Sequence, residues 1–347
     1  MPAGAERLAG LPIQHYADAG IPGMGDPTPE AHEKLPYAGK RALVLGGTSG
    51  IGRAFAEVLV AGGADSVHIG SRSEESVGKT ITELRPMRAS AEQAISSFAV
   101  DLADHYAVRK KASTLIGAEA INLIVMGPAR GADLIADTLQ EGLTPIRQAK
   151  TQEEKDILRG ALREKLRVEV ADPEKIAAAK RLNVDGYEAL FGRMIMYMPE
   201  GSIVVNIPST KSAKRKGKDV FYELVENSKG EEQDIMDEAA ERMAEIGIYT
   251  VNIIPHIVTD TQTGRLIRVM IRSVIADKKE QEQIMSWGVA TADVAEGFKM
   301  VLETDPKTWD THPLNMYIIG SGDPENPGAQ YLADLPDDHP AVNASLL

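Results

Sequence analysis

The glycines between Leu45 and Gly52 are the first candidates for chemistry in this sequence, which reads Leu-Gly-Gly-Thr-Ser-Gly-Ile-Gly there. They follow a short apolar run and precede a run whose apolar residues recur at helical spacing. A phosphate-binding turn requires glycine, because its backbone adopts positive φ, approaches the phosphate closely and lets the helix pack on the strand. The segment therefore predicts a site for a dinucleotide pyrophosphate, made by Gly46, Thr48, Ser49, Gly50, Ile51 and Gly52.

Strands and helices alternate along the chain that must position this turn. Seven strands are predicted by short apolar runs at 41–45, 66–69, 97–100, 121–125, 202–206, 249–254 and 315–319. Helices are predicted between them at 53–60, 74–84, 107–116, 176–198, 222–246 and 292–302. This order is typical of a sheet covered by helices on both faces. The predicted fold class is α/β, with a doubly wound, mostly parallel, seven-stranded, Rossmann-like sheet.

The boundaries of the folded body follow from composition. Residues 1–38 contain prolines and glycines at close spacing, which predicts an irregular arm. The strand and helix alternation is interrupted at about 132–175 by a charged, helix-prone stretch, which predicts a helical insertion. We therefore expect a single domain over 39–325 that includes the insertion, followed by a tail over 326–347.

Charge and composition exclude several classes of function. The 347 residues include 51 Asp and Glu against 38 Lys and Arg, a net charge of −13, so neither nucleic acid nor an anionic membrane is an expected partner. There is no cysteine, and the seven histidines lack metal-ligand spacing, so we expect no metal site. The arm has no apolar stretch of the kind a signal peptide needs, and a cytoplasmic location is expected.

The spacing of Gly46, Gly50 and Gly52 resembles the G-x-x-x-G-x-G turn of the short-chain dehydrogenase/reductase family. Further segments resemble that family's marks in the same order, so the resemblance runs from about residue 40 to 322. These segments are Val100-Asp-Leu102, Asn183-Val-Asp-Gly186, Ser202-Ile-Val-Val-Asn-Ile-Pro-Ser209, Val251-Asn-Ile-Ile-Pro255 with Thr259 or Thr261, Thr291–Glu296 and Ile319-Gly-Ser-Gly322. One departure is Met126-Gly127-Pro128-Ala129, where the family has Asn-Asn-Ala-Gly.

The resemblance implies a nicotinamide coenzyme. At the end of the second strand Ser71 and Arg72 stand where an acid would bind the ribose of NAD, and a basic residue there favours the 2′-phosphate of NADP(H). The other residues that the resemblance assigns to the coenzyme are Asp101 and Leu102 at the adenine, Gly127 through its backbone, Lys229 at the nicotinamide ribose, and Pro255 and Thr259 in the nicotinamide-side loop.

The resemblance also implies a catalytic set of Tyr222, Lys229, Ser209 and Asn183. A tyrosine of the family protonates the substrate oxygen, and an adjacent ammonium lowers the pKa of that phenol by about 1–3 units. The usual spacing is Tyr-x3-Lys, but four residues before Lys229 stands Val225, and the nearest phenol is Tyr222. The resulting Tyr-x6-Lys spacing resembles the enoyl-thioester reductases of the family.

These motifs favour a reductase that transfers hydride from NADPH to the C=C bond of an enoyl thioester. Ser209 lies thirteen residues before Tyr222, as in the carbonyl-reducing branch, so a carbonyl reductase or alcohol dehydrogenase is an alternative. A non-catalytic NADP(H)-sensing module is another. The expected partner is a small-molecule substrate, with a thioester of coenzyme A or of a carrier protein as one possibility. The segment Lys211–Lys218 contains five Lys and Arg residues, and their positive charge would attract such an anionic thioester. The family resemblance implies a homo-tetramer or homo-dimer.

Overall fold

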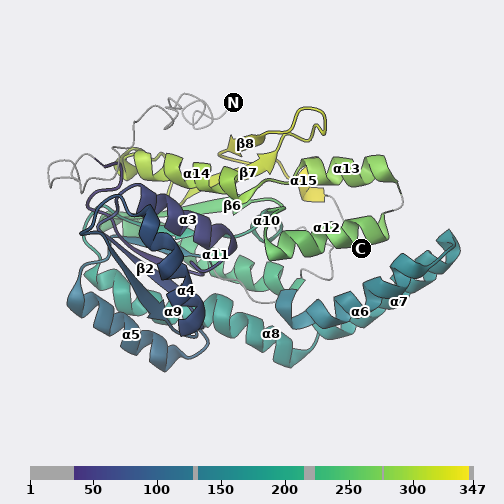
Figure 1. Cartoon of the computed structure of the whole chain (residues 1–347), viewed down its shortest axis with the longest axis horizontal. Coiled ribbons are helices and arrows are strands. Elements are labelled where there is room, and N and C mark those ends of the chain that lie inside the picture. Colours follow the sequence, from purple (N-terminus) through teal and green to yellow (C-terminus); the bar gives the residue numbers. More distant parts are fainter. Residues whose placement is uncertain (1–34, 128–131, 215–222, 276, 344–347) are drawn as a thin grey trace.

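The apolar runs of the sequence form the strands of one sheet in this computed structural model, which describes residues 35–127, 132–214, 223–275 and 277–343. The strand order is β3-β2-β1-β4-β5-β6-β7-β8 (Figure 1). Every neighbouring pair is parallel except β7 and β8. The strands are β1 Arg41–Leu45, β2 Ser66–Ser71, β3 Ala94–Ala99, β4 Leu123–Met126, β5 Ser202–Asn206, β6 Ile248–Pro255, β7 Leu314–Gly320 and β8 Ala329–Leu332.

The α/β doubly wound fold is confirmed, but the sheet has eight strands where the sequence predicted seven. The additional strand, β8, lies within 326–347 and pairs antiparallel with β7, with Tyr317 opposite Leu332. Its four residues, Ala-Gln-Tyr-Leu, are only partly buried or exposed. A short edge strand of this kind lacks the continuous apolar run that identified the buried parallel strands.

Helices cover both faces of the sheet. On one face the Phe55 and Phe298 rings stack with centroids 4.1 Å apart, in a core that includes Val44 of β1. On the other face Leu43 of β1 packs in a second core with Leu190. Neighbouring residues of β1 thus serve opposite cores, as expected for a strand buried on both sides. The covering helices are α3 Gly50–Ala61, α4 Glu74–Leu84 and α14 Thr291–Glu303 on the first face, and α5 His105–Ala118, α9 Gly186–Met194 and α11 Glu223–Glu245 on the second.

The predicted helical insertion is present. It begins with the short η3 Ala132–Ile135 and continues as α6 Ala136–Gln148 and α7 Gln152–Val170, which project from the body beside α8 Pro173–Lys180 (Figure 1). The insertion shares a third apolar core with α12 Gln262–Val274 and α13 Lys278–Ser286, two helices that the sequence did not predict. This packing brings the insertion against the body.

The predicted helix over 176–198 is divided. α8 ends at Lys180, the wider turn η4 Arg181–Asp185 has π-helical geometry, and α9 and the short η5 Ile195–Tyr197 follow. A Cβ on Gly186 would lie 2.5 Å from the carbonyl oxygen of Leu102, so only glycine lets α9 start this close to the loop after β3. The divided helix thereby places η4 beside the carboxyl ends of the strands.

Candidate active site

The glycine-rich turn has the backbone geometry that its sequence predicts. Gly46 and Gly50 have φ of 71° and 55°, values that favour glycine. A Cβ on Gly52 would lie 2.5 Å from the carbonyl oxygen of Gly46, and a Cβ on Gly127 would lie 2.8 Å from that of Leu45. The first turn of α3 therefore lies directly against the loop after β1, and its free N–H groups face outward at the carboxyl end of the sheet.

A cavity of about 890 Å³ opens at this edge, where the strand order reverses between β1 and β4. Such a crevice is the usual ligand site of an open α/β sheet. The structure brings most of the predicted site residues together around it. The predicted residues that line the cavity are Gly46, Thr48, Ser49, Gly50, Ile51, Gly52, Ser71, Arg72, Leu102, Gly127, Ser209, Lys229 and Pro255.

Three of the predicted residues within the described part of the chain do not line this cavity. The Asp101 carboxylate is exposed and accepts from the backbone N–H of Ala103 at 3.0 Å. Thr259 lies on the far side of its loop, where its hydroxyl donates to the carbonyl of Val289 at 3.2 Å. Thr261 takes the place predicted for Thr259: it lines the cavity, and its hydroxyl caps α12 by accepting from Gly264.

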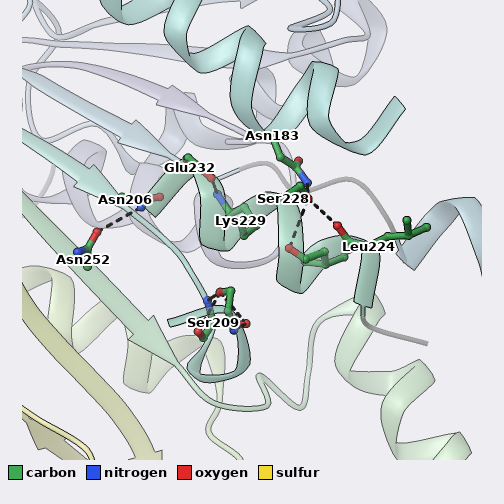
Figure 2. A network of polar contacts seen from close by, with 10 residues as sticks. Asn183, Asn206, Ser209, Leu224, Ser228, Lys229, Glu232 and Asn252 are labelled. Atoms are coloured by element: carbon green, nitrogen blue, oxygen red, sulfur yellow. Dashed lines mark hydrogen bonds and ion pairs between the residues drawn. The ribbon is translucent and has the colours of Figure 1, made fainter. Parts of the chain in front are cut away.

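Asn183, the third residue, is fully buried in η4 and its side-chain amide donates to the hydroxyl of Ser228 at 2.7 Å (Figure 2). That hydroxyl donates in turn to the carbonyl of Leu224 at 2.6 Å. Asn183 therefore ties η4 to the first turns of α11, the helix that carries Lys229. The predicted acid Tyr222 lies outside the described residues.

Ser209 follows β5 and begins the short helix α10 Thr210–Lys214. Its hydroxyl accepts from the backbone N–H of Ser212 at 3.2 Å and lies 3.1 Å from the Ser212 hydroxyl. It thus caps the turn, and it also lines the cavity. A hydroxyl fixed in this way is available to a substrate oxygen without a large loss of side-chain freedom.

Lys229 lines the cavity from α11 although it is only 2% exposed. Its Nζ lies 2.5 Å from a carboxylate oxygen of Glu232 (Figure 2). The same Nζ lies 5.1 Å from the centre of the Tyr187 ring. Burial raises the pKa of Glu232 to about 7, and the Lys229 ammonium opposes part of that rise. Glu232 was not predicted as a site residue, although its spacing of three residues from Lys229 places the two side chains on one face of a helix.

The position four residues after Tyr222 holds Glu226, which is only 6% exposed. Val225 lines the cavity beside Lys229. Lys229 is therefore the lysine that α11 presents to this site. No cluster of three or more potential metal ligands and no helix able to cross a membrane is found among the described residues.

Two further segments that are remote in sequence also line the cavity. The insertion contributes Asp133, Ala136 and Gln140, and α12 contributes Arg265 and Leu266 among others. One residue of the basic run that was predicted to attract a thioester forms an ion pair within the protein: the Lys214 Nζ lies 3.1 Å from a carboxylate oxygen of Asp334. Residues 215–218 of that run lie outside the described residues.

Comparison with known proteins agrees with this geometry. A family model described as the KR domain matches residues 41–157. An uncharacterized oxidoreductase, YvaG, of Bacillus subtilis is 52% identical over 58 residues, 17% of this chain and 22% of that protein. The short-chain dehydrogenase/reductase fsr5 of Gibberella fujikuroi is 40% identical over 65 residues, 19% of this chain and 24% of that protein. The matched segments thus span about a quarter or less of the curated relatives.

Solved structures share the fold at low identity. A Pseudomonas aeruginosa RhlG/NADP active-site complex has a TM-score of 0.56 at 19% identity, covering 78% of this chain and 92% of that one. A 3-oxoacyl (acyl-carrier-protein) reductase of Agrobacterium tumefaciens with NADP bound has a TM-score of 0.60 at 15% identity, covering 82% and 95%. An actinorhodin polyketide ketoreductase variant with NADPH has a TM-score of 0.58 at 18% identity, covering 80% and 95%.

The fold and the glycine-rich crevice are those of a Rossmann-like α/β protein. The KR-domain match over residues 41–157 and the two short matches show that the chain is similar to proteins of the short-chain dehydrogenase/reductase family. The resemblance to its enoyl-thioester branch finds no support among these comparisons.

Replacing Arg72 by serine tests the coenzyme preference. Arg72 lines the cavity beside Ser71 at the end of β2, and a guanidinium there binds a 2′-phosphate through charge-assisted hydrogen bonds. We expect the R72S variant to bind NADPH about 10-fold to 100-fold more weakly and NADH unchanged. Fluorescence titration with both coenzymes measures this, and an equal loss for the two would contradict the assignment.

Proposed function

We propose that this chain is an NADP(H)-dependent oxidoreductase that interconverts a carbonyl group and an alcohol. The observation that supports it best is that Ser209 and Lys229 line the same cavity as the glycine turn and Arg72. A hydroxyl and an ammonium beside a dinucleotide site are suited to a substrate oxygen on which negative charge develops during reduction.

The residues of the cavity fit the coenzyme. The glycine turn and the N-terminus of α3 would bind its pyrophosphate, because a Cβ at Gly52 or Gly127 would clash with backbone and only bare backbone leaves room there. Arg72 would bind the 2′-phosphate, and Lys229 the nicotinamide ribose. When bound, the reduced coenzyme supplies a hydride.

The chain's own residues would then act on the substrate oxygen. The Ser209 hydroxyl donates a hydrogen bond to it, which places the carbonyl carbon at the coenzyme and stabilises the developing charge. Tyr222 is proposed from the sequence alone as the acid that delivers the proton. Lys229 lowers the pKa of that phenol through its positive charge.

Reduction of an enoyl thioester is the second candidate. It rests on the seven-residue separation of Tyr222 and Lys229, because a displaced phenol suits an oxygen remote from the carbon that takes the hydride. The retained Ser209 and the solved structures above, which include a 3-oxoacyl reductase and a polyketide ketoreductase, favour the carbonyl reaction instead. The proposal also includes assembly into dimers or tetramers.

The test is consumption of NADPH with ketones, 3-oxoacyl thioesters and enoyl thioesters as separate substrates. We expect turnover of carbonyl substrates, and a fall in kcat of about 100-fold in Ser209→Ala, since one donor to a developing oxyanion contributes that much. The matched control is Ser113→Ala, whose hydroxyl bonds within α5 to the carbonyl of Arg109. Turnover of enoyl thioesters alone would favour the second candidate, and coenzyme binding without turnover would favour a sensing module.

A further inference from the structure

Glu232 is a buried acid that lies between two cavities. On one side it contacts Lys229, which lines the coenzyme cavity. On the other it lines a separate groove of about 340 Å³ between α9 and α11. The two cavities share no lining residue, and the Glu232 side chain is only 3% exposed.

The partition between the cavities is one turn of α11. Lys229 and Glu232 are three residues apart, on one face of the helix, and their charged groups meet across that turn. Tyr187 of α9 completes the partition, since its ring lies against the Lys229 ammonium and also lines the groove. The Glu232 carboxylate and the Lys229 ammonium thus form a buried charged contact between the groove and the coenzyme cavity.

Carbonyl reduction consumes one proton per turnover in addition to the hydride, so the site must be supplied from outside. We propose that Glu232 carries this proton from the groove to Lys229, and that the Lys229 ammonium turns from Glu232 toward the coenzyme when the coenzyme binds. The expected effect on kcat rests on the proposed function. The expected proton uptake on coenzyme binding does not, because it is measured without turnover.

The proton balance closes over one cycle. Lys229 loses a proton toward the cavity to restore the acid that protonated the substrate oxygen, so one of its N–H bonds breaks. The Glu232 O–H bond then breaks as the Lys229 N–H bond re-forms. Water in the groove returns a proton to the Glu232 carboxylate. The net change is one proton moved from solvent to the alcohol product.

The charges around Glu232 suit this role. Lys229 faces it from α11 and Tyr187 from α9, and burial together with Glu232 raises the pKa of Tyr187, so that phenol stays neutral. The other charged residues that line the groove are Glu188 and Arg242, and the remaining lining is apolar apart from Tyr187. On the α8 side, Lys180 pairs with the neighbouring Glu231 and is also influenced by Asp185 of η4. The pKa of Glu232 near 7 lets the carboxyl exist in both protonation states at neutral pH.

The first experiment is calorimetry of NADP⁺ binding in buffers of different ionisation enthalpy. When Lys229 turns away, Glu232 loses the group that lowers its pKa, so the wild type should take up about half a proton at pH 7. Glu232→Gln should take up none, and the control Glu231→Gln should behave as the wild type. Equal proton uptake in Glu232→Gln and the wild type would overturn the proposal.

The second experiment is the pH profile of kcat for carbonyl reduction. Glu232→Gln should lower kcat about 100-fold and should remove the limb of the profile near pH 7. Glu232→Asp keeps a carboxyl and should recover part of the rate. A Glu232→Gln enzyme with the wild-type kcat and profile would overturn the relay. If the wild type turns over no carbonyl substrate, the proposed function fails, whereas the calorimetric result for Glu232 stands by itself.

Discussion

Gly52→Ala is expected to raise the Kd for NADP(H) at least about 100-fold, equivalent to about 2.7 kcal/mol. The new Cβ would lie 2.5 Å from the carbonyl oxygen of Gly46 and 2.8 Å from its carbonyl carbon. Both are backbone atoms of the phosphate-binding turn, so they cannot rotate away as a side chain would. Relief of the clash must move α3 from the turn, which displaces the N–H groups that face the pyrophosphate. Coenzyme titration by fluorescence measures the loss.

The matched control is Gly78→Ala in α4. A Cβ there meets nothing within 4 Å, and the residue is exposed within a helix. We expect unchanged coenzyme affinity and a gain of about 0.5–1 kcal/mol in stability, because alanine loses less backbone freedom on folding than glycine. Tight NADPH binding by Gly52→Ala would show that the turn is not the pyrophosphate site.

Lys229→Met is expected to destabilise the folded protein by about 3–5 kcal/mol at pH 8, because it leaves the buried Glu232 carboxylate without its cation. The double variant Lys229→Met/Glu232→Gln should recover most of this loss, since it buries no charge at the pair. Urea unfolding of the two variants measures the loss of stability in the single variant and its recovery in the double variant. Equal stability of the two variants at pH 8 would contradict the prediction.

The pH dependence of Lys229→Met follows from the direction of the Glu232 pKa. Burial already raises this pKa above its unfolded value of about 4.3, and loss of the ammonium raises it further. Between the two pKa values the folded state holds a proton that the unfolded chain has released. Stability therefore falls as pH rises through that window, and the loss in Lys229→Met should be small at pH 4 and largest above the folded pKa.

The parts of the fold that the sequence predicted were those set by local pattern. The turn at Gly46 to Gly52 and the seven parallel strands depend on neighbouring residues, and they were found at nearly their predicted positions. The edge strand β8 was not predicted, because its four residues are only partly buried or exposed and form no continuous apolar run. The helices α12 and α13 were not predicted either. In α12 the buried residues Ile267, Met270 and Ile271 recur at helical spacing, so its sequence did carry a signal that the prediction did not use.

In the candidate site too, features set by local sequence were predicted and features set by tertiary packing were not. Spacing could not decide which threonine of the loop after β6 faces the cavity, and the structure selects Thr261 over Thr259. The bond between Asn183 and Ser228 joins residues 45 apart in sequence, so only the folded chain reveals it. The spacing of three residues between Lys229 and Glu232 is visible in the sequence. The burial of Glu232, which raises its pKa, depends on the packing of α9 and α11 and is visible only in the structure.

The projecting pair of helices α6 and α7 lines part of the cavity but is not part of the sheet or of the glycine turn. It packs in an apolar core with α12 and α13, and α6 contributes Ala136 and Gln140 to the lining of the cavity. Mutations in this pair can reshape what the cavity admits while the sheet and its glycine turn stay intact. Selection for a new substrate could therefore act on one continuous stretch of about forty codons, and chimeric proteins that exchange this stretch offer a direct route to altered substrate range.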